Sequence, residues 1–196
     1  MTPSAALQAP FDTARLTIRP MTLADADFAA ALWGDPQVGR YLADRVYRDG
    51  DDLRRDIADM DTWENEYMFI ACDRATGREI GTCSVGQEGE PGRWGWGYCV
   101  HPDCWGRGYA TEMARAMMDF ALSRGIHRFQ GTVAAEHAAS CRVMEKLGLR
   151  LHGQSTFTKR GTDLRYVSNI YRLDLSPEPT GVSEETGRPT IRKETP

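Results

Sequence analysis

The sequence feature that most restricts the fold is a strand that runs through a glycine-bearing loop into a long helix and on into a second strand. The helix, over 108–124, carries apolar side chains at a period of 3.6, and Gly125 stands where a C-terminal cap is expected. A run of strand-forming residues follows at 126–133. Because a helix joins the two strands, the unit over 98–133 predicts a parallel strand pair.

The other expected elements describe a mixed α/β fold. Three strands joined by short turns precede the loop, which predicts an antiparallel meander. Thr22 and Asp25 resemble a capping box at the start of an early helix, and Gly148 suits the end of a late one. In chain order, the expected elements are a strand over 15–19, helices over 22–33, 37–42 and 51–63, strands over 67–72, 79–85 and 93–100, the helix over 108–124, a strand over 126–133, a helix over 138–147, and strands over 149–157 and 164–175.

Size and composition are those of one globular domain. The chain has 196 residues, of which 41% are hydrophobic and 27% are charged. Residues 1–10 lack periodicity, and residues 176–196 hold four of the ten prolines but few large apolar side chains. We therefore predict a flexible segment over 1–10, a folded domain over 11–175 and a disordered tail over 176–196.

Charge and cysteine content exclude several classes of partner. The sequence shows no signal peptide and no apolar run of about 20 residues, so we expect a soluble, cytoplasmic protein without a membrane partner. The net charge of -4 at pH 7 gives no overall attraction to phosphate backbones, which argues against nucleic acid as the main ligand. The cysteines form no CxxC pair and no zinc-spaced cluster, so we expect reduced, mostly buried thiols and no metal site. They are Cys72, Cys83, Cys99, Cys104 and Cys141.

The loop before the long helix has the composition of an anion-binding site. Gly106 and Gly108 let backbone N–H groups turn inward without obstruction by a Cβ atom, and the helix start adds free donors and a partial positive charge. Arg107 adds a charge that can contact a phosphate. A pyrophosphate is one expected ligand, and a structural turn whose glycines serve only close packing is the alternative. The loop lacks the Gly or Ala of a dinucleotide fingerprint at Thr111, and it lacks the Gly-Lys-Ser/Thr ending of a Walker motif.

Four stretches together match a known family. They are Arg15–Pro20, Gly97–Tyr98, Trp105–Glu112 and Ser140–Gly148. With these stretches the chain resembles the GCN5-related N-acetyltransferase (GNAT) superfamily, in particular its ribosomal-protein N-acetyltransferase branch, over nearly the whole folded unit. The resemblance implies a mixed, mostly antiparallel sheet that is splayed at its centre and flanked by helices. It also implies acetyl-coenzyme A (acetyl-CoA) as cosubstrate.

The resemblance assigns residues to this cosubstrate. It implies that the pyrophosphate lies on backbone amides from Gly106 to Thr111, and that the pantetheine lies along Cys99 and Val100 like an added strand. His137 stands where relatives carry an Asn that contacts pantetheine; a solvated histidine at a helix start is the alternative. The implied contacts are Cys99, Val100, Gly106, Arg107, Gly108, Tyr109, Ala110, Thr111, His137 and Ser140.

Two residues that many relatives use in catalysis are absent. The position aligned with a general-base Glu is Gly95, and the position aligned with a Tyr that protonates the leaving thiolate is Met144. Ser140 is then the nearest candidate acid, and capping of its own helix is the alternative. A weak acid suffices for a coenzyme A thiolate, since the reference thiol pKa is about 8.5.

The missing base favours a weakly basic acceptor. At pH 7 an α-amine with a pKa of about 8 is neutral in roughly a tenth of its molecules, whereas a lysine-type amine with a pKa of about 10.4 is neutral in about one in 2,500. An α-amine therefore needs little help. Water that relays a proton to His101, Asp103 or Glu136 is the alternative.

The sequence therefore predicts an acetyl-CoA-dependent N-acetyltransferase that moves the acetyl group to a primary amine, such as a protein N-terminal α-amine, by direct attack in a ternary complex. A catalytically weak acyl-CoA-binding or regulatory module is the alternative, because the usual Glu and Tyr are absent. Trp94, Trp96 and Tyr98 share one face of a strand, and we expect them to fill the core; the wall of an acceptor pocket is the alternative. The resemblance implies that a turn over 159–163 shapes the acceptor mouth. We expect a monomer or a homodimer.

Overall fold

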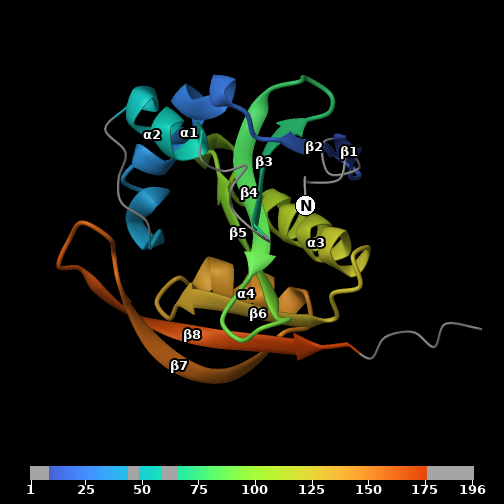
Figure 1. Ribbon diagram of the computed structural model, residues 1–196, viewed down its shortest axis with the longest axis vertical. Coiled ribbons are helices and arrows are strands. Elements are labelled where there is room, and N and C mark those ends of the chain that lie inside the picture. Colours follow the sequence, from blue (N-terminus) through green and yellow to red (C-terminus); the bar gives the residue numbers. More distant parts are fainter. Residues whose placement is uncertain (1–8, 44–48, 59–65, 176–196) are drawn as a thin grey trace, which may run out of the picture.

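An eight-stranded sheet runs through the described part of the chain (Figure 1). The computed structural model describes residues 9–43, 49–58 and 66–175, so the predicted tail over 176–196 and most of the predicted segment over 1–10 lie outside the described residues. The strand order is β1-β2-β3-β4-β5-β6-β8-β7, and every neighbouring pair is antiparallel except β5 and β6. The predicted mixed, mostly antiparallel sheet is confirmed.

Most helices and strands follow the predicted order, with small shifts at their ends. In chain order they are β1 (Phe11–Asp12), β2 (Leu16–Pro20), α1 (Ala26–Gly34), α2 (Gly50–Ala58), β3 (Glu66–Asp73), β4 (Glu79–Gln87), β5 (Trp94–Val100), α3 (Tyr109–Leu122), β6 (Arg128–Ala134), α4 (Ala138–Lys146), β7 (Arg150–Thr158) and β8 (Arg165–Asp174). The short strand β1 was not expected, because two residues carry no periodic signal.

Two predicted helices differ from the structure. The helix expected over 37–42 is only a 3-10 turn at Gly39–Tyr41. The Asp35 carboxylate accepts the amides of Gln37 (2.7 Å) and Val38 (3.2 Å), as a helix N-cap does, but the backbone becomes extended at Leu42 (ψ 134°), which ends the helix after one turn. The helix expected over 51–63 is α2, which ends at Ala58, and the last five residues of that prediction lie outside the described chain.

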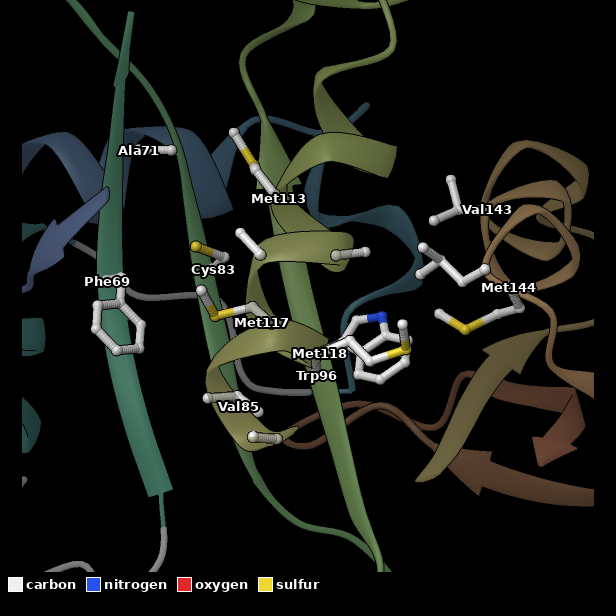
Figure 2. Close-up of a cluster of buried hydrophobic side chains, with 14 of the residues drawn as sticks. Phe69, Ala71, Cys83, Val85, Trp96, Met113, Met117, Met118, Val143 and Met144 are labelled. Carbon is white, nitrogen blue, oxygen red and sulfur yellow. The ribbon is translucent and has the colours of Figure 1, made fainter. Parts of the chain in front are cut away.

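The main core lies between the sheet and the pair α3 and α4 (Figure 2). Met113 and Met117 of α3 are fully buried, and Cys83 of β4 packs in the same cluster. Trp94 and Trp96 are also buried there, which confirms their predicted place in the core. Each large side chain that leaves water in this way contributes about 1.5–3 kcal/mol. All five cysteines are buried, as expected, and none of these described residues forms a disulfide.

The opposite face of the sheet is the one against which α1 packs. Trp33 of α1 donates from Nε1 to Oγ1 of Thr82 in β4 (3.0 Å). Successive side chains of a strand point to opposite faces, so Thr82 shares its face with Ser84 and, across the pair with β5, with Gly97 and Cys99. Although β5 is a central strand, Gly97 is exposed. The α1-side face of the sheet is therefore open to solvent at this point.

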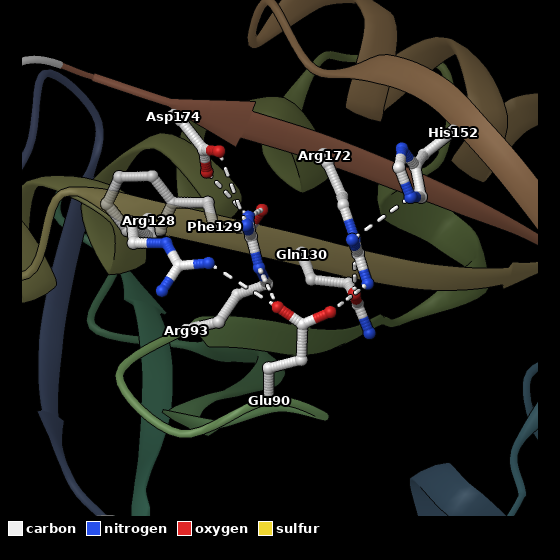
Figure 3. A network of polar contacts seen from close by, with 8 residues as sticks. All are labelled: Glu90, Arg93, Arg128, Phe129, Gln130, His152, Arg172 and Asp174. Carbon is white, nitrogen blue, oxygen red and sulfur yellow. Dashed lines mark hydrogen bonds and ion pairs between the residues drawn. The ribbon is translucent and has the colours of Figure 1, made fainter.

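The parallel strands β5 and β6 meet at one end only. Trp94 pairs with Phe129, and no further register pair joins the two strands in the described chain. Arg93, whose side chain is 3% exposed, fixes this end: it donates to the backbone oxygen of Phe129 (2.9 Å) and to the carboxylate of Asp174 (2.6 Å) (Figure 3). The sheet is thus splayed at its centre, as expected, and it opens toward Tyr98–Val100.

Candidate functional site

The end of β5 presents backbone groups that β6 does not reach. The amide of His101 donates to the carbonyl of Ile80 (2.8 Å), one residue beyond the pair of Gly81 and Val100. In an antiparallel ladder this places the N–H and C=O of Val100 on the side away from β4. Trp105 donates from Nε1 to the Val100 carbonyl (2.6 Å). The Val100 N–H therefore faces the side from which β6 has diverged, where an extended ligand can pair with it.

The predicted anion-binding loop joins β5 to α3 and leaves backbone amides open. Gly106 and Gly108 have φ values of 74° and 82°, in the left-handed region that residues with a Cβ atom rarely adopt. Gly108 is the N-cap of α3 and has no side chain with which to cap the first amides. These amides remain available to an anion, and the helix dipole makes this end positive. Arg107 is exposed beside them.

A charged pair holds this loop to the start of the sheet. Arg15 and Glu112 form a salt bridge (2.6 Å), and Nη1 of Arg15 donates to the carbonyl of Arg107 (2.9 Å). Oγ1 of Thr13 also donates to Glu112 (2.6 Å). Burial raises the pKa of Glu112, but hydrogen bonds from Thr13 and Arg15 outweigh it and hold the pKa below its ordinary value. The sequence analysis missed this pair because its members lie 97 residues apart.

Ser140 makes a contact across the splay. Its Oγ lies 2.8 Å from Oη of Tyr98, and either hydroxyl can donate. Tyr98 comes from β5 and Ser140 from the first turn of α4, so the bond links the two sides of the site. Burial raises the pKa of Tyr98 to about 12, although the bond from Ser140 opposes the shift. The phenol therefore keeps its proton at neutral pH, and Ser140 as the acid stays a prediction.

His137 comes three residues before Ser140, and its ring packs against an aromatic side chain. Its ring stacks on Tyr41, with 4.6 Å between centroids and 25° between planes. Tyr41 also meets Tyr166 edge-on at 5.7 Å. Burial lowers the pKa of His137, which favours the neutral imidazole. These contacts disfavour the solvated alternative, and the contact with pantetheine stays a prediction.

The three groups considered as water-linked bases have structural partners. His101 accepts the amide of Asp103 at Nδ1 (3.3 Å) and so caps the 3-10 turn that follows β5. The Asp103 carboxylate faces Arg78 (3.4 Å), and the Glu136 carboxylate faces Arg40 (3.8 Å). Each of the three side chains thus has a neighbour in the structure, and a water relay to one of them stays an alternative.

A carboxylate that the sequence analysis did not consider lies on the α1-side face. Gly86 pairs with Gly95, so the side chain of Glu88, two residues further on, projects to the same face. A Cβ atom on Gly95 would lie 2.9 Å from that of Glu88, which shows that the Glu88 side chain occupies the space beside Gly95. Oγ1 of Thr132 in β6 donates to the Glu88 carboxylate (2.9 Å). The register of β4 and β5 creates this arrangement, and no local sequence signal reports it.

The turn between β7 and β8 closes on the segment that follows α1. Lys159 is 6% exposed, and its ammonium donates to the carbonyl of Gly39. The amide of Arg160 donates to the carbonyl of Ala43 (2.8 Å). Lys159 therefore anchors the turn and does not present a charge at its surface.

A pocket of about 370 Å³ lies between α1 and the residues that follow β5. Phe28 and Leu32 form part of its apolar wall, and Asp35, Arg78 and Glu79 contribute charges of both signs. None of the residues predicted to contact acetyl-CoA lines it, so it is separate from the predicted cosubstrate site.

Two further observations concern the described residues as a whole. None of their helices has the length and apolar character needed to span a membrane. Within the same residues, no group of three or more His, Cys, Asp and Glu side chains is arranged to hold a metal ion.

Comparisons with known proteins agree with this fold. Residues 15–150 match the family model described as an acetyltransferase (GNAT) domain. An uncharacterized N-acetyltransferase, p20, of Bacillus licheniformis is 30% identical over 146 residues, which cover 72% of this chain and 82% of the relative. Spermidine N-acetyltransferase from Vibrio cholerae, solved with CoA and spermine, has a TM-score of 0.71 at 19% identity, with 83% and 97% of the chains covered. A ribosomal-protein alanine acetyltransferase from Vibrio fischeri has a TM-score of 0.70 at 14% identity, with 87% and 100% covered.

Proposed function

This chain belongs to the GNAT family of acetyltransferases, and we propose that it transfers the acetyl group of acetyl-CoA to a primary amine by direct attack in a ternary complex. The acceptor class that we put first is the α-amine at the N-terminus of a protein or peptide. Proteins of similar structure include a ribosomal-protein alanine acetyltransferase and a spermidine acetyltransferase, so polyamines are the second class to test.

The observation that carries the proposal is the continuity of open backbone donors from the end of β5 to the start of α3. The Val100 N–H faces away from β4, and the left-handed Gly106 and Gly108 lead to the uncapped amides of α3. An anionic pyrophosphate fits the helix start, and the amides of a pantetheine arm fit the free strand edge. The described residues thus suit both chemical parts of acetyl-CoA.

The chain's own groups then have distinct tasks, while acetyl-CoA supplies an activated acyl group. The Val100 N–H is directed to donate to a carbonyl oxygen and to stabilise negative charge on it. The hydroxyls of Ser140 and Tyr98 hold a proton on the α4 side of the splay, where a departing sulfur can take it. His137, stacked on Tyr41, lies at the start of α4, three residues before Ser140.

The test is thiol release by the full chain. Acetyl-CoA is mixed with a peptide that begins with alanine, with an N-terminally blocked peptide that contains one lysine, and with spermidine. We expect release of free thiol that depends on the amine, and an acetylated product identified by mass. Binding of CoA without any amine-dependent release would contradict the proposal and favour an acyl-CoA-binding module.

A further inference from the structure

The two faces of the splayed sheet have different chemistry. The hydroxyl pair of Ser140 and Tyr98 lies on the face covered by α3 and α4. The α1-side face carries Gly97, which is exposed in the centre of the sheet. If the sulfur leaves on the hydroxyl side, the amine enters from the α1-side face. An amine that arrives as an ammonium ion needs a negative group and a proton acceptor on that face.

Glu88 lies on the α1-side face, level with the part of the sheet where β5 and β6 have already separated. Thr132 lies three residues beyond Phe129, and Gly97 lies three residues beyond the paired Trp94. Because Thr132 donates to the Glu88 carboxylate (2.9 Å), this carboxylate reaches the level of Gly97 along the parallel strands. The Glu88 carboxylate therefore lies where β5 and β6 have separated, and not at the end where Trp94 pairs with Phe129.

The shape of the neighbouring strand makes room for this side chain. A Cβ atom on Gly95 would lie 2.6 Å from the backbone oxygen of Gln130 and 2.9 Å from Cβ of Glu88. The Gln130 backbone oxygen excludes a larger residue at Gly95 even if Glu88 moves, and the Glu88 side chain fills the space that remains beside this glycine. The carboxylate next to Gly95 therefore comes from the residue that follows β4.

The charge of Glu88 is also uncompensated, in contrast to that of its neighbour. Glu90, in the same turn, contacts Arg172 (2.9 Å) and Arg128 (3.4 Å) (Figure 3). In the described residues Glu88 has no ion pair, and the partner seen for it is the neutral hydroxyl of Thr132. A carboxylate that is half-buried and not neutralised attracts a cation.

We propose that Glu88 receives the acceptor: its carboxylate pairs with the incoming ammonium and takes one proton from it, directly or through one water, so that the neutral amine can attack. This inference rests on the proposed function. The amine nitrogen forms a bond to the acetyl carbon, and the carbon–sulfur bond breaks with its electron pair on sulfur. Of the three ammonium protons, one stays on the amide, one ends on Glu88 and one ends on sulfur by way of the hydroxyl pair or water.

The experiment compares Glu88→Gln with the control Glu90→Gln, which makes the same change of charge in the same turn. For spermidine and for the lysine peptide at pH 7, we expect Glu88→Gln to lower kcat/KM by about 100-fold, the lower range for general base catalysis. The loss should be smaller for the alanine peptide, because more of an α-amine is already neutral. The loss should also shrink as the pH rises toward the pKa of the amine.

A second readout does not depend on turnover. Calorimetry should give the same CoA affinity for the wild type and both variants, and weaker binding of spermidine to the CoA complex of Glu88→Gln alone. Equal rates and equal spermidine affinities for the two variants would overturn the role of Glu88 and leave the proposed function standing. A wild type that binds CoA but acetylates none of the three amines would overturn both.

Discussion

At the scale of single residues, Ser140 and Tyr98 form one hydrogen-bonded unit, so we expect the removal of either hydroxyl to lower kcat. We predict that Ser140→Ala lowers kcat by about 100-fold, the lower end of the range for general acids. Tyr98→Phe should lower kcat in the same direction, since it removes the partner of the Ser140 hydroxyl. The double variant should be no slower than Ser140→Ala, because residues that act as a unit are not additive. If the losses in single-turnover rate were additive in the double variant, the two hydroxyls would act independently, which would contradict this prediction.

The wild-type pH profile follows from the same pair. Burial raises the pKa of Tyr98 to about 12, so its phenol does not titrate between pH 6 and pH 10. We expect no ionisation of Tyr98 in this range when the phenol absorbance is followed by ultraviolet difference spectra of wild type and Tyr98→Phe. A titration step near pH 8 that disappears in Tyr98→Phe would contradict the raised pKa of Tyr98.

Gly108 offers a test with a matched control elsewhere in the chain. Gly108→Val forces a β-branched residue into a left-handed conformation, at a cost of roughly 1–2 kcal/mol. Gly77, in the turn between β3 and β4, has a similar φ of 72°, so Gly77→Val carries a similar strain away from the loop. We expect both variants to lower Tm, and only Gly108→Val to weaken CoA binding in calorimetry. Equal CoA affinity in the two variants would show that the loop does not hold the cosubstrate.

Single residues also show how far the sequence could predict the site. The glycines of the loop were predicted because a strand, a loop and a helix follow one another in the chain. Glu88 could not be predicted, because its place depends on the register of β4 with β5 and on the divergence of β6. The partner of Ser140 was missed for the same reason, although Ser140 itself was singled out.

At the scale of elements, the salt bridge of Arg15 with Glu112 joins the turn between β1 and β2 to α3 and supports the cosubstrate loop. Arg15 contacts both Glu112 and the carbonyl of Arg107. We predict that Arg15→Ala weakens CoA binding about 5-fold to 10-fold, about 1 kcal/mol, because the loop loses this support. Arg74→Ala is the control, because Arg74 donates to the same turn, at the carbonyl of Thr13 (2.9 Å). Equal CoA affinities for the two variants would show that the Arg15–Glu112 salt bridge stabilises the fold but does not contribute to CoA binding.

The Arg15–Glu112 salt bridge also makes the stability of the fold depend on pH. The pKa of Glu112 is lowered in the fold, so its contribution to stability is present above the ordinary carboxyl pKa of about 4.3 and is lost as the pH falls below it. Glu112→Gln should therefore be less stable than the wild type at pH 7, and the difference in Tm should narrow as the pH is lowered past that value. A constant difference in Tm across this range would contradict the assignment.

Elements with strong local signals were predicted well. α3 has an apolar stripe and a terminal glycine, and its bounds are close to those expected. The helix expected over 37–42 is capped by Asp35 as a helix start would be, but it ends after one turn because Leu42 is extended. The residue pattern of so short a segment does not predict where the helix ends.

At the scale of the whole molecule, Arg93 decides where the sheet is closed and where it opens. Its bonds to Phe129 and Asp174 tie β5, β6 and β8 together (Figure 3). We predict that Arg93→Ala lowers the free energy of unfolding by about 2 kcal/mol, the range for hydrogen bonds to a charged group. Arg128→Ala, which removes an exposed contact with Glu90, should cost under about 1 kcal/mol. Urea denaturation of both variants decides whether the buried arginine or the surface network holds this end.

We propose that the splayed strand edge and the glycine loop together hold acetyl-CoA by backbone amides. The most direct test is amide hydrogen exchange of the full chain with and without CoA. We predict that CoA slows exchange mainly at the Val100 amide and at the amides of Gly106–Thr111, with little change in the turn between β3 and β4. Unchanged exchange across both segments at saturating CoA would show that their amides do not bind CoA.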